Sequence, residues 1–341
     1  MTRPLNATAA SVVLLISAAF SPYAPAQSAI GTEGDRILDT VEVVGVLPGP
    51  GFWKVSKGEN TVWILASIRP VPKRMQWETI KLERKLAESQ QLIGSPTVSL
   101  DADIGFFGKL GLLPSLLKAR KNPDGKTLQQ ILPPATYQRW LVMKRKYIGN
   151  DKGIEYFRPI FAAQELYEKA IAKAGLSEDG IVWPKAEKLA KRADVLVFQP
   201  EVKVNIGDPK QFIKRFNRDA LNDVACFERT LDSIERDVQF MAARAMLWAE
   251  GDVAGLRAIS QEDFSGACID ALLGSGVAKN AGLADVPERV RGAWLAAVEK
   301  SLDRNRSAVA VVSIAELIKP GGMLDRLRAK GYAISEPDAM P

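Results

Sequence analysis

Histidine is missing from all 341 positions of the sequence. Its absence excludes Ser-His and Cys-His catalytic pairs, in which an imidazole takes the proton of the nucleophile. It also excludes every metal site built on imidazole ligands. The composition is intermediate, since 47% of the residues are hydrophobic, 25% are charged and the formal net charge is +6. These values indicate a globular protein rather than a disordered chain or a membrane protein with many spans.

Only one long apolar segment is present, and it lies near the N-terminus. Arg3 precedes an apolar run at residues 9–20, and Ala24-Pro25-Ala26 offers small residues at a cleavage position. This order is typical of a secretory signal peptide. The alternative, a membrane anchor, needs about 20 apolar residues, and this run is shorter. We therefore predict a signal peptide at residues 1–26, export to the periplasm or the exterior after cleavage near Ala26, and no transmembrane segment in the mature chain.

Cysteine is almost as rare as histidine, because only Cys226 and Cys268 are present. In an oxidising compartment an even count favours a disulfide, and the alternative is two buried thiols. A bridge across this loop stabilises the fold by about 3–4 kcal/mol in the chain-entropy model. We predict a disulfide with a structural role.

Short apolar segments at both ends of the chain predict strands. Residues 52–55 and 61–65 flank Lys57-Gly58-Glu59-Asn60, which is a hairpin pattern. An uncharged, β-branched run at residues 308–314 is typical of a central strand. The other strand candidates are residues 92–93, 195–198, which we expect to be buried, and 332–335.

Helical periodicity dominates the middle of the chain. The predicted helices are residues 76–90, 110–120, 134–147, 154–174, 184–192, 208–249 with a break near Asn222, 252–259, 262–278, 285–302 and 317–330. Asp285-Val286-Pro287-Glu288 resembles a capping box. The pattern predicts a mixed α/β (α+β) fold, with a central mixed sheet built from the N- and C-terminal strands, flanking helices and a large helical middle.

Because distant segments share this sheet, we expect one domain at residues 49–336. The helical middle is an insertion at about residues 104–192. A flexible lead-in at residues 27–48 precedes the domain, and a tail at residues 337–341 follows it.

The resemblance to a known family rests on four segments. They are residues 51–55 (GFWKV), 61–70 (TVWILASIRP), 308–317 (AVAVVSIAEL) and 320–332 (PGGMLDRLRAKGY). The chain resembles the TraB/GumN family, which includes the TIKI-type metalloproteases, over most of residues 50–336. The resemblance implies an exported or membrane-associated protein. In the better-known members, a Gly-x-x-His motif at the exit of each of two buried strands and an acid after the early helix hold a divalent ion for hydrolysis.

This sequence departs from the family at each of these positions. The two motifs read Ala66-Ser67-Ile68-Arg69 and Ser313-Ile314-Ala315-Glu316, and no acid directly follows residues 92–93. The family's metal chemistry cannot be carried over, and we predict no metal and no cofactor. If the fold is kept, Arg69 and Glu316 meet at the strand exits, and we predict an ion pair between them. The alternative is that both are solvated.

The polar neighbours of this pocket are expected to be Ser67 and Ser313. Gln199, which follows a predicted strand, or Glu201 two residues later, matches the position of a further acid in the relatives.

Other patterns have competing explanations. Ser115 and Lys118 match the Ser-x-x-Lys motif of penicillin-recognising enzymes, but the companion motifs of those enzymes are absent. Asp101 and Asp103 suit Mg²⁺ or Mn²⁺, although a helix cap or turn explains them as well. The basic helix faces at residues 139–146 and 185–192 suit anionic lipid or glycan, or simply solvated surface.

The leading hypothesis is an exported cell-envelope module that binds or scaffolds and has lost its metal centre, that is, a pseudoenzyme. The alternative is a hydrolase that assembles a metal site from carboxylates only, or one that uses Ser115 and Lys118. A third hypothesis is an outer helical surface that recruits a partner chain. The candidate partners are an envelope protein or an anionic glycan or lipid, and no nucleic acid is expected because no such motif is present.

Overall fold

The predicted N-terminal hairpin forms one side of the central sheet. In the computed structural model of the chain, β2 (Phe52–Lys57) pairs antiparallel with β3 (Asn60–Ser67). Gly58 in the turn has a φ of +58°, a conformation that glycine adopts without steric cost. The structure describes residues 45–101, 114–115, 117–218, 221, 223–259, 268 and 272–337. The hairpin is confirmed, whereas the signal peptide at residues 1–26, most of the lead-in and most of the tail lie outside the described residues.

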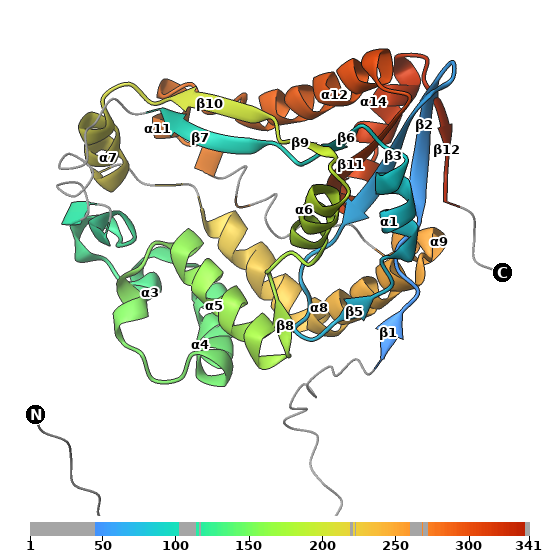
Figure 1. Cartoon of the computed structure of the whole chain (residues 1–341). Helices are drawn as coiled ribbons and strands as arrows, with labels where there is room; N and C mark the ends of the chain where they lie inside the picture. The colour runs from blue at the N-terminus through green and yellow to red at the C-terminus, as the bar shows by residue number, and fades with distance from the viewer. Residues whose placement is uncertain are drawn as a thin grey trace, which may run out of the picture. The chain divides into compact units, whose positions relative to one another are not determined.

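The central sheet joins both ends of the chain, as predicted. Its strand order is β12-β2-β3-β11-β6-β9 (Figure 1). The strands that complete it are β6 (Gln91–Ile93), β9 (Leu196–Phe198), β11 (Ser307–Ser313) and β12 (Ala333–Ser335). β3, β11, β6 and β9 run parallel, and β2 is antiparallel to both of its neighbours. The fold is therefore mixed α/β, and the parallel strands all end at one edge of the sheet.

Helices cover the sheet so that its central strand is fully enclosed. Residues 308–312 of β11 are buried without interruption, which accounts for their uniformly apolar character. α1 (Ile80–Ala87) and α6 (Val182–Arg192) pack on each other, α1 also contacts β11, and α6 contacts β6 and β9. α12 (Val286–Arg304) contacts β2, β3, β6 and β11. The apolar run at residues 308–314 predicted this enclosed position correctly.

The helical middle has a core of its own. It contains η1 (Pro123–Gly125), α3 (Leu128–Ile131), α4 (Pro134–Tyr147), η2 (Gly153–Tyr156) and α5 (Pro159–Lys173). Buried side chains of α3, α4, η2 and α5 pack with the part of α8 (Val224–Glu250) from Phe227 to Ala242. The last turns of α8, from Ala245 to Ala249, belong to the core of the sheet instead. α8 therefore contributes to both hydrophobic clusters.

Several predicted boundaries differ from the structure. The helix predicted at residues 76–90 begins later, because β5 (Gln76–Trp77) pairs with β1 (Val46–Leu47). The helix predicted at residues 154–174 is divided between η2 and α5. The helix predicted at residues 317–330 is divided into α13 (Ile314–Ile318) and α14 (Met323–Ala329), because Pro320-Gly321-Gly322 interrupts it. The break predicted near Asn222 separates α8 from α7 (Pro209–Arg218).

The expected burial of residues 195–198 is wrong for most of that segment. Among the described strands β9 lies at the edge of the sheet and pairs with β6 alone, and Leu196 and Phe198 are exposed. β6 and β9 lead into β7 (Thr97–Asp101) and β10 (Glu201–Asn205), a parallel pair that sequence analysis missed. The remaining elements are β4 (Val71–Pro72), β8 (Leu176–Ser177), α9 (Val253–Ala258) and α11 (Gly276–Asn280).

Candidate functional site

Two hydroxyl groups lie side by side where the parallel strands end. Ser67 and Ser313 are register partners at the last positions of β3 and β11. Ser67 Oγ donates a hydrogen bond to the Val312 carbonyl at 3.3 Å, and Ser95, beyond the end of β6, donates to the Val311 carbonyl at 3.2 Å. Crevices at the carboxyl ends of parallel strands are common ligand sites in α/β proteins. The strand exits are therefore the candidate location of a binding site.

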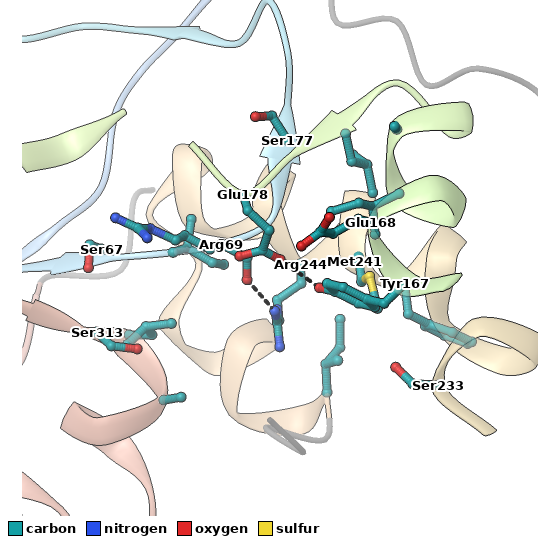
Figure 2. A pocket seen from close by; sticks show the side chains of 18 of the residues that line it. Ser67, Arg69, Tyr167, Glu168, Ser177, Glu178, Ser233, Met241, Arg244 and Ser313 are labelled. Carbon is teal, nitrogen blue, oxygen red and sulfur yellow. Dashed lines mark hydrogen bonds between the residues drawn. The ribbon is translucent and has the colours of Figure 1, made fainter. Parts of the chain in front are cut away.

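A cavity of about 1080 Å³ opens at these strand exits. We call it the strand-exit cavity. It lies between the ends of β3 and β11 and the surfaces of α5, β8 and α8, and Figure 2 shows most of its lining side chains. The lining residues are Ser67, Ile68, Arg69, Lys73, Ser95, Gln164, Tyr167, Glu168, Ile171, Ala172, Leu176, Ser177, Glu178, Ser233, Phe240, Met241, Arg244, Ala258, Ile259, Ser313, Ile314 and Ala315. Of the six pocket residues predicted from sequence, Ser67, Arg69 and Ser313 line this cavity.

Arg69 contributes a cation that is held against a glycine. A Cβ built on Gly180 would lie 2.6 Å from Arg69 Nη2 and 3.1 Å from Nε, so a larger residue at position 180 would displace the guanidinium from this place. The guanidinium forms no ion pair within the described part of the chain. It is therefore oriented by packing and keeps its charge available to the cavity.

α8 supplies a second arginine and an anchor for β3. Arg244 Nη2 donates a hydrogen bond to the Arg69 carbonyl at 2.7 Å. One turn later, Trp248 Nε1 donates to the Ala66 carbonyl at 2.8 Å. Sequence analysis missed both residues, because they lie about 175 positions from β3 and carry no local motif. Their spacing of four residues on one helix is the only sequence signal that relates them.

Two acidic residues also line the cavity. Glu168 on α5 accepts a hydrogen bond from Gln164 Nε2 at 2.8 Å, and Glu178 after β8 accepts one from the Tyr167 hydroxyl at 2.7 Å. Neither carboxylate forms an ion pair with any residue that the structure describes. Figure 2 shows Glu168 and Tyr167 on the helical side and Ser67 and Ser313 on the strand side.

The predicted Arg69–Glu316 ion pair is wrong. Glu316 accepts hydrogen bonds from Lys319 Nζ at 2.6 Å and from Arg291 Nε at 3.0 Å. Burial alone would raise the pKa of the Glu316 carboxyl, but these two bonds outweigh it and the pKa is lowered. The reason is geometric: α13 starts directly after β11 and turns Glu316 toward α12, whereas Arg69 points to Gly180.

Gln199 and Glu201 also lie outside the strand-exit cavity. Gln199 Nε2 donates a hydrogen bond to the Ser95 carbonyl at 2.8 Å, so it positions a residue that does line the cavity. Glu201, the first residue of β10, accepts one from Ser99 on β7 at 2.6 Å. Both residues therefore stabilise the region in which β6 and β9 lead into β7 and β10.

The structure gives little support to the other two candidate sites, at Ser115 and Lys118 and at Asp101 and Asp103. Ser115 and Lys118 line a second cavity of about 1120 Å³, together with Asn217, which donates a hydrogen bond to the Ser115 carbonyl. Asp101 ends β7, and Asp103 lies outside the described residues. Within the described ranges, no group of three or more Cys, Asp or Glu side chains is placed to hold a metal ion.

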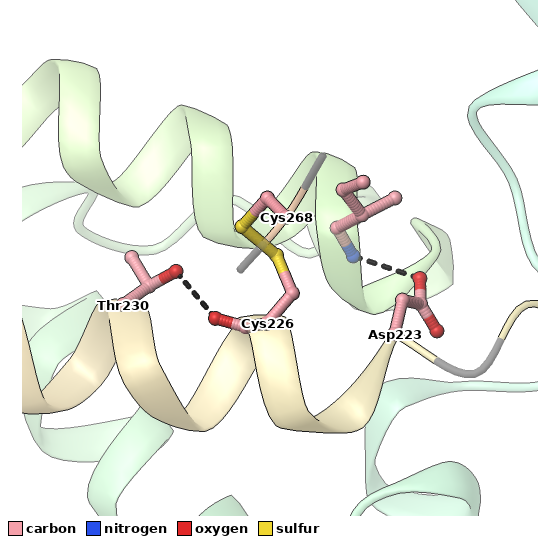
Figure 3. Close-up of a disulfide and its surroundings, with 5 residues drawn as sticks. Asp223, Cys226, Thr230 and Cys268 are labelled. Carbon is pink, nitrogen blue, oxygen red and sulfur yellow. Dashed lines mark hydrogen bonds between the residues drawn. A yellow bond between two sulfur atoms is a disulfide. The ribbon is translucent and has the colours of Figure 1, made fainter. Parts of the chain in front are cut away.

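The predicted disulfide is confirmed. Cys226 and Cys268 are bonded, with their Cα atoms 4.7 Å apart (Figure 3). Cys226 is fully buried near the start of α8, and its carbonyl accepts a hydrogen bond from the Thr230 hydroxyl. The alternative of two free thiols is thus ruled out by the structure, and the bridge lies away from the cavity-lining residues.

Comparison with known proteins identifies the family of the chain. The model of the TraB/PrgY/gumN family matches residues 51–336. The chain belongs to this family. No curated protein and no solved structure matches the chain. In this TraB/PrgY/gumN protein, no helix among the described residues is long and apolar enough to cross a membrane.

The residues present do not fit the divalent ion that the family resemblance implies. Arg69, at one motif position, is a cation and offers no lone pair to a metal. Glu316, at the other, is already bound by Arg291 and Lys319. No catalytic step through a metal follows from this arrangement.

Proposed function

We propose that this TraB/PrgY/gumN protein is an exported, non-catalytic binding module of the cell envelope. Its strand-exit cavity would bind a ligand that carries an acidic group. A single observation carries the proposal: Arg69 and Arg244 line the cavity next to the strand exits, and neither forms an ion pair in the part of the chain that the structure describes.

Arginine is suited to this role because its planar guanidinium donates several hydrogen bonds to one carboxylate or phosphate. The two side chains are also restrained before any ligand arrives. Arg69 is seated against Gly180, and Arg244 donates to the Arg69 carbonyl. Restrained groups lose less conformational freedom on binding, which favours affinity.

Export is supported by two features of the sequence. Residues 1–26 have the layout of a signal peptide, and the Cys226–Cys268 bridge suits an oxidising compartment. Placement in the envelope is supported by the TraB/PrgY/gumN family, because the resemblance implies an exported or membrane-associated protein.

Isothermal titration with inorganic phosphate and with succinate, using the mature protein at low salt, tests the binding function. One of the two probes will bind the wild type more tightly. We expect Arg69→Gln and Arg244→Gln each to lower the affinity for that probe by about tenfold, because each removes a charge-assisted hydrogen bond. Arg145→Gln is the matched control, because Arg145 is an exposed arginine on α4 away from the cavity. Equal binding by all variants would overturn the proposal.

Metal analysis separates the proposal from the hydrolase alternative. A metal-free protein whose anion binding is indifferent to chelator is expected. Stoichiometric Mn, Co or Zn retained after dialysis would instead favour an enzyme with a carboxylate metal site.

A further inference from the structure

Charges of both signs line the strand-exit cavity without neutralising each other. The cations are Arg69, Lys73 and Arg244, and the anions are Glu168 and Glu178. None of the five forms an ion pair with any described residue. Ion pairs do form between other charged residues of the chain.

Two pairs outside the cavity illustrate the contrast. Arg139 binds Asp232 at 2.6 Å and Glu235 at 2.9 Å, and Lys144 binds Glu155 at 2.6 Å. Charges without an ion pair in the described part of the chain also occur outside the cavity, for example at Lys81 and Asp194, so the site is distinguished by the gathering of both signs around one cavity.

Neutral groups hold these side chains in place. Tyr167 donates to Glu178, and Gln164 donates to Glu168. Lys73 Nζ donates to the Ala172 carbonyl at 3.3 Å. A hydrogen bond from a neutral donor fixes a carboxylate but leaves its net charge, so both acids remain attractive to a cation.

An apolar surface lies among the charged residues. Ile171, Leu176 and Met241 line the cavity and are 3%, 1% and 7% exposed. Such side chains contact methylene groups and exclude water, which strengthens the nearby electrostatic interactions.

We infer that the strand-exit cavity binds a small zwitterion. Its acidic group binds Arg69 and Arg244, its protonated amine binds Glu168 and Glu178, and its aliphatic part contacts Met241 and its apolar neighbours. This inference rests on the proposed binding function and adds the second charge. A ligand with one charge leaves the opposite group of the cavity without a partner, so the zwitterion gains an interaction that the single-charge ligand lacks.

Titration calorimetry with three sets of probes tests this assignment on the mature protein. The zwitterions are the ω-amino acids from aminobutanoate to aminooctanoate. The controls are the unsubstituted carboxylates and the alkylamines of the same chain lengths. We expect at least one amino acid to bind about tenfold more tightly than both of its single-charge counterparts, a difference of about 1.4 kcal/mol.

Two variants assign the two ends of the ligand. The double variant Glu168→Gln, Glu178→Gln keeps the acceptors for Gln164 and Tyr167 and should remove the preference for the zwitterion while carboxylates bind at least as tightly as to the wild type, because two repelling charges are gone. Gly180→Ala keeps every charge but displaces the Arg69 guanidinium, and it should weaken both the amino acid and the carboxylate. Glu88→Gln, an exposed acid after α1 and outside the cavity, is the control and should bind as wild type.

The possible results distinguish zwitterion binding from the proposed binding of an acidic group. If carboxylates bind through the arginines and the amino acids bind no more tightly, the zwitterion is excluded and anion binding stands. If no probe binds at millimolar concentration, both are overturned. If the double variant keeps the full preference for the zwitterion, the assigned amine site is wrong.

Discussion

Tryptophan side chains hold the strands that lead to the strand-exit cavity. Trp248 donates to the Ala66 carbonyl of β3, and Trp294 donates to the Val311 carbonyl of β11 at 3.1 Å. Trp53 on β2 is buried to the same degree, but its indole nitrogen finds no acceptor among the described residues. Equal burial therefore conceals a difference in hydrogen bonding.

This difference predicts unequal costs for the same substitution. Trp248→Phe and Trp53→Phe both remove part of a buried ring, but only the first breaks a buried hydrogen bond. We expect Trp248→Phe to lower the free energy of unfolding by about 1 kcal/mol more than Trp53→Phe, because an unsatisfied buried group costs about 1–3 kcal/mol. Urea denaturation measures both, and an equal or larger loss for Trp53→Phe would contradict the assignment.

Asp223 is a buried carboxyl with a defined pH effect. It is 3% exposed and accepts a hydrogen bond from the Ile160 backbone N–H at 2.9 Å (Figure 3). Burial raises its pKa, and this outweighs the backbone hydrogen bonds and the attraction of Arg158. The folded state thus binds the proton more tightly than the unfolded chain, whose Asp pKa is about 3.9.

The stability that Asp223 contributes is present below the unfolded pKa and is lost as the pH rises through the folded pKa. Asp223→Asn stays neutral and can still accept from Ile160. The free energy of unfolding of wild type minus that of Asp223→Asn should therefore increase as the pH falls from about 7 to about 4. Urea denaturation of both proteins at several pH values measures this difference. A difference that decreases over this range would show that the sign is wrong.

At the scale of single elements, two helices with an acidic N-cap residue differ. Asp252 before α9 accepts a hydrogen bond from the Gly255 N–H at 2.8 Å. Asp285 before α12 makes no such bond, so the predicted capping box is absent. Glu288, its expected partner, binds Arg291 at 3.2 Å and also Arg326. An ion pair within the helix and one with the distant Arg326 therefore take the place of the capping box.

The two caps predict a matched pair of variants. Asp252→Ala should destabilise the protein by about 1 kcal/mol, the typical loss for an N-cap. Asp285→Ala should lower the free energy of unfolding by only a few tenths of a kcal/mol, because it removes an exposed contact with Arg289 at 4.0 Å. Thermal and urea unfolding compare the two variants. A greater loss of stability for Asp285→Ala would show that Asp285 does cap α12.

At the scale of the whole molecule, α8 and its disulfide connect parts of the fold. Phe227 and Leu231 of α8 belong to the core of the helical middle, and Ala245 and Trp248 belong to the core of the sheet. The bridge from Cys226 closes a loop of 42 residues that contains the rest of this helix. The unfolded chain loses much of its freedom when this loop is closed.

Removal of the bridge should lower the free energy of unfolding by about 3–4 kcal/mol in the chain-entropy model. The variant with Cys226→Ala and Cys268→Ala tests this by urea denaturation. Dithiothreitol should lower the stability of the wild type toward that of the variant and leave the variant unchanged. A loss below about 1 kcal/mol would show that the loop is already restrained without the bond.

The sequence by itself determined the family, the fold class, the hairpin, the enclosed strand at residues 308–314 and the cysteine pair. These features depend on local periodicity, turn residues and composition, which are readable along the chain. It also placed Ser67, Arg69 and Ser313 at the strand exits, because strand ends follow from strand positions.

The tertiary structure alone decided which side chains meet. Glu316 sits in α13, where each residue rotates the side-chain direction by about 100°, so a strand-exit position did not fix where its carboxylate points. Arg244 reaches the Arg69 carbonyl across 175 residues, and Glu168 and Glu178 approach from the helical middle. The charges of the cavity come from four separate segments, and only their packing brings them together.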